Sequence, residues 1–123
     1  MNFDNTNKPK GALRLWLAFK NTLKGLGWMC KNEAAFKQEI LLTAVLTVVT
    51  FFLNVTPIEQ AILICSLLVI LLVETINTAI EAVVDRIGLE MHPLSGLAKD
   101  LGSAAVFISC LISTIIWGAV LWP

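Results

Sequence analysis

The chain has 123 residues, of which 57% are hydrophobic and 15% are charged. A soluble domain of this length buries one modest core and cannot cover so much apolar surface, so the composition excludes an ordinary soluble protein. Basic and acidic residues are equal in number, and no nucleic-acid partner is expected. The three cysteines lie far apart, without metal-site spacing, and are interpreted as small hydrophobes. We expect an all-α membrane protein with one integral-membrane domain over residues 1–123.

An amphipathic segment covers residues 11–32. Bulky apolar residues recur there at spacings of three and four positions: Trp16, Phe19, Leu23, Leu26 and Cys30. Basic residues gather on an adjoining face: Arg14, Lys20, Lys24 and Lys31. Such a helix suits the membrane interface. A packed helix of a soluble domain would show the same pattern, but the chain offers no other soluble element to pack on, so we predict a surface helix.

The first apolar segment covers residues 36–53, close to the minimum of about 17 residues that crosses a bilayer. A turn follows at residues 54–57. Thr56 is predicted to cap the next helix, with Pro57 as its first residue and Glu59 completing a Thr-x-x-Glu capping box. This pattern assigns Glu59 a structural role.

A second span is predicted over residues 58–84, and its last turns carry one polar stripe: Glu74, Asn77, Glu81 and Asp85. At about 100° per residue these side chains share one side of the helix. The opposite side is apolar: Ile76, Ile80, Val83 and Ile87. The helical rise puts Glu74 just inside the hydrocarbon core and Glu81 at its rim. An ionisable residue within a span is costly enough to indicate function.

A polar stretch from Asp85 to Ser95 precedes the third predicted span, at residues 101–122. Small residues recur along that span every four positions, a pattern that lets helices approach closely: Ala105, Ser109 and Ser113. Trp117 and Trp122 are predicted to lie at the membrane interface.

The basic residues also predict orientation. Seven of the nine lysines and arginines precede Ile40, where the purely apolar part of the first span begins, and the other two are Arg86 and Lys99. By the positive-inside rule, the N-terminus and the loop at residues 85–99 are cytoplasmic and the C-terminus lies outside. The polar stripe then faces the compartment that contains nucleotides.

The polar residues at this level suit phosphoryl transfer. Glu33 and Glu81 could hold Mg²⁺, which prefers one or two carboxylates together with phosphate oxygens. Lys99 and Arg14 could neutralise phosphates, and Glu74 could accept the proton of a lipid hydroxyl.

Other interpretations of these residues remain open. Carboxylates and lysines at a membrane rim are often solvated helix ends, and a proton path would use similar residues. The chain has no GxxxxGK[ST] loop and no HRD or DFG element, so the residues alone do not define a kinase. Three spans cannot shield the polar stripe from lipid on all sides, which predicts a homotrimer with shared sites.

Three blocks of sequence resemble the bacterial integral-membrane diacylglycerol kinases. They read NEAAFKQE at residues 32–39, VETINTAIEAVVDRIG at 73–88 and AKDLGSAAV at 98–106. The resemblance implies a small trimeric enzyme of the bacterial inner membrane, with a surface helix and three spans. It also implies transfer of the γ-phosphate of Mg-ATP to diacylglycerol, which gives phosphatidic acid.

The resemblance also implies roles for individual residues. Glu74 is similar to the family's general base, and Glu33 and Glu81 to its metal ligands. The positions that match nucleotide contacts are Arg14, Asn21, Glu33, Glu81, Glu90, His92, Lys99 and Asp100. The positions expected near the lipid are Arg14, Gln38, Glu39, Glu74 and Ser103. Asn77 supports the site, and Asn21 stands where the family carries a tyrosine that contacts the nucleotide.

Two alternative functions stay open from the sequence. A related branch of the family phosphorylates undecaprenol, although residues 85–88 and 94–96 are more similar to the diacylglycerol branch. A different class of protein, a small non-enzymatic proton-path or assembly subunit, would carry similar polar residues within its spans.

Overall fold

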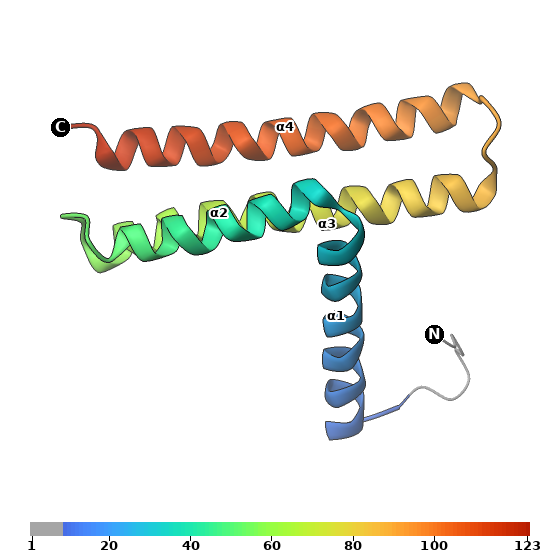
Figure 1. Cartoon of the computed structure of the whole chain (residues 1–123), viewed down its shortest axis with the longest axis horizontal. Helices are drawn as coiled ribbons and strands as arrows, with labels where there is room; N and C mark the ends of the chain where they lie inside the picture. The colour runs from blue at the N-terminus through green and yellow to red at the C-terminus, as the bar shows by residue number, and fades with distance from the viewer. Residues whose placement is uncertain (1–8) are drawn as a thin grey trace. The chain divides into compact units, whose positions relative to one another are not determined.

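The computed structural model describes residues 9–123, and all of its regular structure is helical. The four helices are α1 (Ala12–Asn32), α2 (Ala34–Thr50), α3 (Pro57–Ile87) and α4 (Pro93–Leu121) (Figure 1). The chain forms two compact units, one that ends at Lys37 and one that runs from Gln38 to Pro123. The all-α fold class is therefore confirmed.

Helix α1 matches the amphipathic segment predicted at residues 11–32 to within one residue. It begins after Gly11, whose φ of 67° lies in the left-handed region that favours glycine. It ends where the Glu33 N–H donates to the Met29 carbonyl at 2.8 Å and the backbone becomes extended. The large apolar side chains along α1 are exposed, as a helix that contacts lipid requires: Leu13, Trp16, Phe19 and Leu23.

Helix α3 begins with the predicted capping box. The Thr56 hydroxyl accepts from the Glu59 N–H at 3.2 Å, and the Glu59 carboxylate accepts from the Thr56 N–H at 3.0 Å. Pro57 is the first helical residue, where its missing N–H costs nothing. The structural role assigned to Glu59 is thus confirmed.

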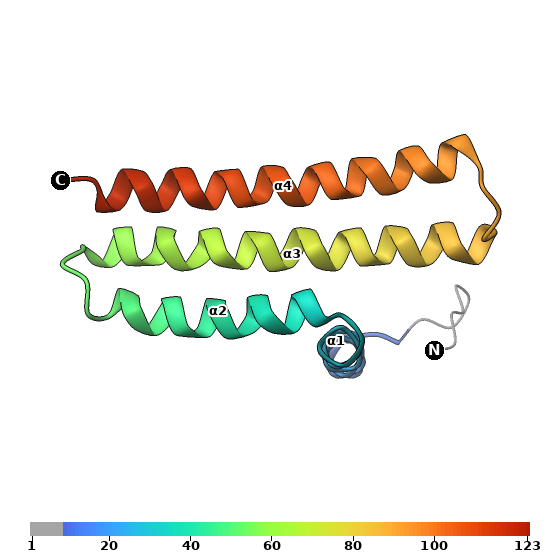
Figure 2. The ribbon, with the colours of Figure 1, turned by 45° about the horizontal axis from the view of Figure 1, so that its top comes forward.

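Helices α3 and α4 form an antiparallel hairpin that is paired along its whole length (Figure 2). Small residues of α4 are buried at this contact, as the four-residue pattern predicted for Ser109 and Ser113. The third predicted member, Ala105, is exposed, and Gly102 is buried instead. Within one chain the buried residues of α4 are seven and four positions apart, and Ala105 lies outside this buried stripe.

The second hairpin helix is longer than its predicted span. Helix α4 begins at Pro93, eight residues before the predicted apolar stretch, and α3 continues to Ile87. The polar stretch predicted at residues 85–95 therefore shrinks to a connection at residues 88–92. The span was predicted from apolar residues alone, which leaves out polar residues at the start of a helix. Helix α4 extends into polar sequence because Pro93 and the His92 cap favour its first turn.

In the part of the chain that the structure describes, α3 and α4 are the two helices long and apolar enough to cross a membrane. Helix α2 has 17 residues and ends at Thr50, three residues short of the predicted span. It lies beside α3 in the second unit (Figure 2). The Gln60 side chain donates to the buried Thr50 hydroxyl at 3.0 Å and joins the two helices.

Candidate functional site

The side of α3 that carries the predicted polar stripe is partly covered by the neighbouring helices. Glu74, Asn77 and Glu81 are half-buried, whereas Asp85 at the end of the stripe is exposed. On the opposite side, Val83 is 61% exposed. The predicted apolar residues of that side are exposed throughout: Ile76, Ile80, Val83 and Ile87. The orientation inferred from helical periodicity is therefore correct.

Asn77 connects the stripe to α4. Its Nδ2 donates to Glu81 Oε1 at 3.3 Å, and its Oδ1 is buried without a hydrogen-bond partner among the described residues. The side chain packs against Gly102, where a Cβ atom would overlap with Oδ1. Asn77 thus restrains the Glu81 carboxylate, and its supporting role in the site stays a prediction.

Glu39 and Glu74 form a pair of neighbouring carboxyl groups. Their side chains are close enough to hydrogen bond, although α2 and α3 are separate helices. One Glu39 oxygen, Oε2, is buried without a partner in residues 9–123. The pair therefore places two carboxyl groups from different helices next to each other within the second unit.

Lys99 supplies a positive charge beside the acidic stripe. Its Nζ lies 2.9 Å from Asp85 Oδ1, and the two side chains are 46% and 47% exposed. The lysine also interacts electrostatically with Glu81. A pair exposed to this degree contributes little to stability. Its chemical value is a cation held next to the half-buried carboxylate.

The connection between α3 and α4 carries two predicted nucleotide contacts. A small cleft of about 130 Å³ at this end of the hairpin is lined by Asp85, Glu90, His92 and Lys99, among others. His92 also caps α4, because its Nδ1 accepts from the Leu94 N–H at 3.1 Å. The structure therefore brings Glu90, His92 and Lys99 together. Asp85, which the sequence did not assign to nucleotide binding, joins them through its pair with Lys99.

Several predicted site residues have no such contacts to support their roles. Gln38, Asp100 and Ser103 are exposed in the second unit. Arg14, Asn21 and Glu33 belong to the first unit, the first two exposed and Glu33 half-buried. The pairing of Glu33 with Glu81 around a metal ion therefore stays a prediction.

The donor groups of the described residues limit the kind of metal site. No three His, Cys, Asp or Glu side chains in residues 9–123 lie close enough together to hold a metal ion by themselves. Mg²⁺ that arrives with a nucleotide needs only one or two carboxylates, because phosphates and water supply the other ligands. Glu81, restrained by Asn77, fits this second kind of site.

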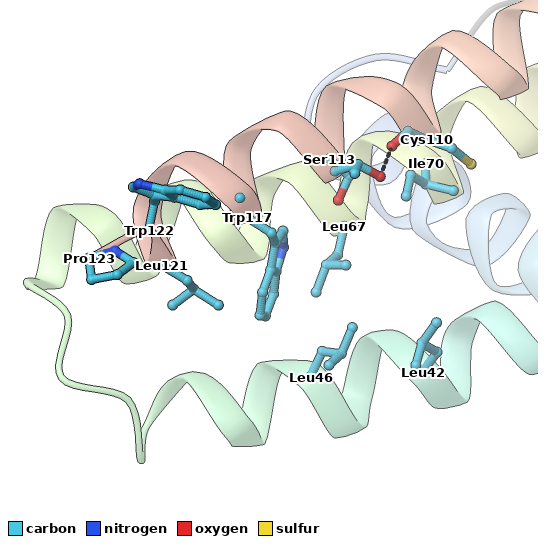
Figure 3. A pocket seen from close by; sticks show the side chains of 12 residues that line it. Leu42, Leu46, Leu67, Ile70, Cys110, Ser113, Trp117, Leu121, Trp122 and Pro123 are labelled. Carbon is cyan, nitrogen blue, oxygen red and sulfur yellow. Dashed lines mark hydrogen bonds between the residues drawn. The ribbon is translucent and has the colours of Figure 1, made fainter.

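An apolar groove runs along the second unit from the level of Leu42 and Ile70 toward Pro123 at the C-terminus (Figure 3). Its volume is about 680 Å³, and its lining includes Leu42, Ile70 and Trp117. Leu42 follows Glu39 by one helical turn and Ile70 precedes Glu74 by one turn. The groove therefore begins about one helical turn from each glutamate, and neither Glu39 nor Glu74 lines it. Sequence reasoning missed it because it depends on three helices together.

A second polar cluster lies on the groove side of the hairpin, far from the carboxyl pair. Ser66 and Ser113 share a hydrogen bond of 3.1 Å, and Trp117 Nε1 donates to Ser66 Oγ at 3.1 Å. Both serines are buried. Trp117 is therefore held between helices and does more than mark a membrane interface, the only role predicted for it. All three side chains have partners, as residues that join helices require.

The fold and the site define a class: a helical membrane protein with acidic, basic and amide groups at one end of a helical hairpin. The family described as prokaryotic diacylglycerol kinase matches residues 20–121. A diacylglycerol kinase from Haemophilus influenzae is 47% identical over 115 residues, which cover 94% of this chain and 98% of the relative. A diacylglycerol kinase from Escherichia coli K12 is 45% identical and covers 94% and 95%.

A less similar diacylglycerol kinase also matches this chain over most of its length. A diacylglycerol kinase from Helicobacter pylori is 37% identical over 119 residues, which cover 97% of this chain and 93% of the relative. The match includes the α3–α4 hairpin with its polar stripe. The chain belongs to the prokaryotic diacylglycerol kinase family.

Proposed function

We propose that this chain is a diacylglycerol kinase that transfers the γ-phosphate of Mg-ATP to the free hydroxyl of 1,2-diacylglycerol. The products are phosphatidic acid and ADP. The observation that carries the proposal is the Glu39–Glu74 carboxyl pair, which lies one helical turn along the chain from Leu42 and Ile70 of the apolar groove. A lipid alcohol needs a proton acceptor within reach of apolar surroundings, and this arrangement provides one.

Glu74 is the proposed general base. It accepts the hydroxyl proton as the lipid oxygen forms a bond to the γ-phosphorus and the bond to the bridging oxygen of ADP breaks. The half-buried position of Glu74 keeps it near the lipid and away from bulk water. Gln38, Glu39 and Ser103 are proposed to hold the glycerol part of the substrate.

The nucleotide is proposed to bind at the end of the hairpin nearer the α3–α4 connection. Glu33 and Glu81 would hold Mg²⁺, which when bound neutralises charge on the phosphates. Lys99 and Arg14 would contact the phosphates. The remaining proposed nucleotide contacts are Asn21, Glu90, His92 and Asp100.

We infer that the chain spans the bacterial inner membrane three times. We also infer that the site lies on the cytoplasmic side of that membrane. Most basic residues precede α2, and the connection at residues 88–92 follows Arg86 and precedes Lys99. Labelling of single cysteines in intact cells should reach position 56 from outside and not position 90. Labelling with the opposite pattern would contradict this orientation.

We infer a homotrimer, because one chain leaves half-buried carboxylates and many large apolar side chains uncovered. Glu74 and Lys99 would then act from different copies. Mixing Glu74→Gln subunits with Lys99→Leu subunits should restore part of the activity that each lacks alone. A fully active monomer would contradict the trimer.

The proposed activity is tested with the purified full-length protein in mixed micelles. ATP consumption and phosphatidic acid formation are measured with diacylglycerol, with undecaprenol, and without a lipid alcohol. Turnover that depends on diacylglycerol supports the proposal, and a clear preference for undecaprenol would move the chain to the other branch. Failure to consume ATP with either lipid would favour a non-enzymatic membrane subunit.

A further inference from the structure

Asn77 of α3 packs directly against Gly102 of α4. A Cβ atom at Gly102 would overlap with Asn77 Oδ1 and would lie 3.0 Å from the amide carbon. The Cα–H bond that alanine would replace therefore points at the amide oxygen. A contact of this kind is at most a weak hydrogen bond. Only glycine leaves room for the Asn77 side chain in this position.

The need for glycine here comes from space and not from backbone conformation. Gly11 is the one glycine with positive φ among the described residues, and Gly102 is an ordinary helical residue. Gly96 and Gly118 in the same helix have no atom within 4 Å of an added Cβ. Because glycine is unfavourable inside helices, Gly102 has a local reason that the other two lack.

The two ends of the Asn77 amide have unequal surroundings. Nδ2 donates to Glu81 Oε1 at 3.3 Å, whereas Oδ1 is buried and has no hydrogen-bond partner within residues 9–123. A buried acceptor without a partner is unfavourable, and an apolar side chain would pack without that cost. The amide is therefore best explained by its Nδ2 group, which restrains the Glu81 carboxylate.

We propose that Gly102 is a positioning residue: by admitting the Asn77 amide between α3 and α4, it fixes the direction of the Glu81 carboxylate. Gly102 touches no reacting group and acts through Asn77 alone. The inference rests on the proposed function, in which Glu81 serves the nucleotide. It adds that Gly102, Asn77 and Glu81 act as one unit.

The test is a double-mutant cycle in the full-length protein, with Gly102→Ala, Asn77→Ala and both together. Outer residues that orient metal ligands typically change affinity or activity by about 10- to 100-fold when they are replaced. We expect Gly102→Ala to lower kcat/KM for Mg-ATP by about that factor, with the KM for diacylglycerol unchanged. Gly27→Ala is the control, because it adds the same methyl group inside a helix where no atom lies within 4 Å of the added Cβ, and it should leave both constants unchanged.

Binding is measured separately from turnover, by titrating a non-hydrolysable ATP analogue in the presence of Mg²⁺. Gly102→Ala should weaken binding in the wild-type background. In the Asn77→Ala background the overlap is gone, so adding Gly102→Ala should change binding by less than about twofold. Losses that multiply in the double variant would overturn the proposal, because they would mean that Gly102 serves general helix packing.

Two further outcomes are separable. If Gly102→Ala alone fails to fold, the double variant must fold and must bind the analogue as Asn77→Ala does; failure of the double variant to fold would overturn the proposal. An inactive wild-type protein would contradict the proposed function. An active wild-type protein whose nucleotide affinity is untouched by Gly102→Ala would contradict this inference alone.

Discussion

The two halves of the α3–α4 hairpin both place polar side chains between helices, but these side chains differ in whether all their polar atoms have hydrogen-bond partners. In the half nearer the C-terminus, Ser66 forms hydrogen bonds with both Ser113 and Trp117. In the half nearer the connection at residues 88–92, Asn77 Oδ1 has no partner in the described chain. The Ser66–Ser113 and Asn77–Gly102 contacts lie about 16 Å apart along the hairpin, so the difference belongs to two separate regions.

This difference distinguishes polar residues that join two helices from polar residues that belong to the proposed site. Interhelical hydrogen bonds within membranes contribute modest stability when both partners are satisfied. Unsatisfied buried groups reduce stability, and proteins retain them mainly at functional sites. The half with Glu74, Asn77 and Glu81 therefore contains the proposed site, and the half with Ser66 holds the hairpin together.

The substitution with the largest expected effect is Glu74→Gln, which should lower turnover. Loss of a general base should lower kcat at least about 100-fold, while Mg-ATP affinity changes little because Glu81 and Lys99 remain. Turnover with diacylglycerol and nucleotide binding are measured on the same preparation. Glu59→Gln is the control, because it changes a carboxylate of the same helix that serves only the capping box. Near-normal turnover in Glu74→Gln would remove the proposed base.

Glu81→Gln should affect the binding of Mg-ATP instead of proton transfer. Its side chain is proposed to hold the cation that accompanies ATP, so Mg-ATP affinity should fall at least about tenfold together with turnover. Titration of nucleotide at several Mg²⁺ concentrations separates this effect from that of Glu74→Gln. If affinity stays unchanged in Glu81→Gln, the proposed division between a base and a metal ligand is wrong.

The sequence predicted those features that depend on one helix at a time. The Thr56–Glu59 capping box, the bounds of α1 and the side of α3 that carries Glu74 all follow from local spacing. Helical periodicity alone placed Asn77 beside Glu81, and their hydrogen bond agrees with it.

Features that depend on two helices together were not predictable. The contact of Asn77 with Gly102 requires a particular antiparallel register, and the sequence gives no measure of register. For the same reason the sequence did not indicate that Gly102 is buried or that Trp117 bonds to Ser66. The pairing of Glu39 with Glu74 likewise depends on how α2 lies beside α3.

The smallest expected effect is that of Ser66→Ala, which sharpens the comparison from the other side. The substitution leaves Trp117 Nε1 and the Ser113 hydroxyl without their shared partner. Stability in detergent should fall by about 1 kcal/mol, with turnover per folded molecule unchanged. Thr114→Val is the control, because its hydroxyl is exposed and bonds only within α4. A large loss of turnover in Ser66→Ala would mean that the two halves are not separate in function.

The most direct test of this separation is the thermal stability of Glu74→Gln, measured in detergent beside its turnover. The amide removes one of two adjacent carboxyl groups and can donate to Glu39, so relief of that unfavourable pairing should keep the Tm unchanged or raise it. We expect a protein that is at least as stable as the wild type and almost inactive. A Tm that falls together with turnover would contradict it, because Glu74 would then hold the helices together as Ser66 does.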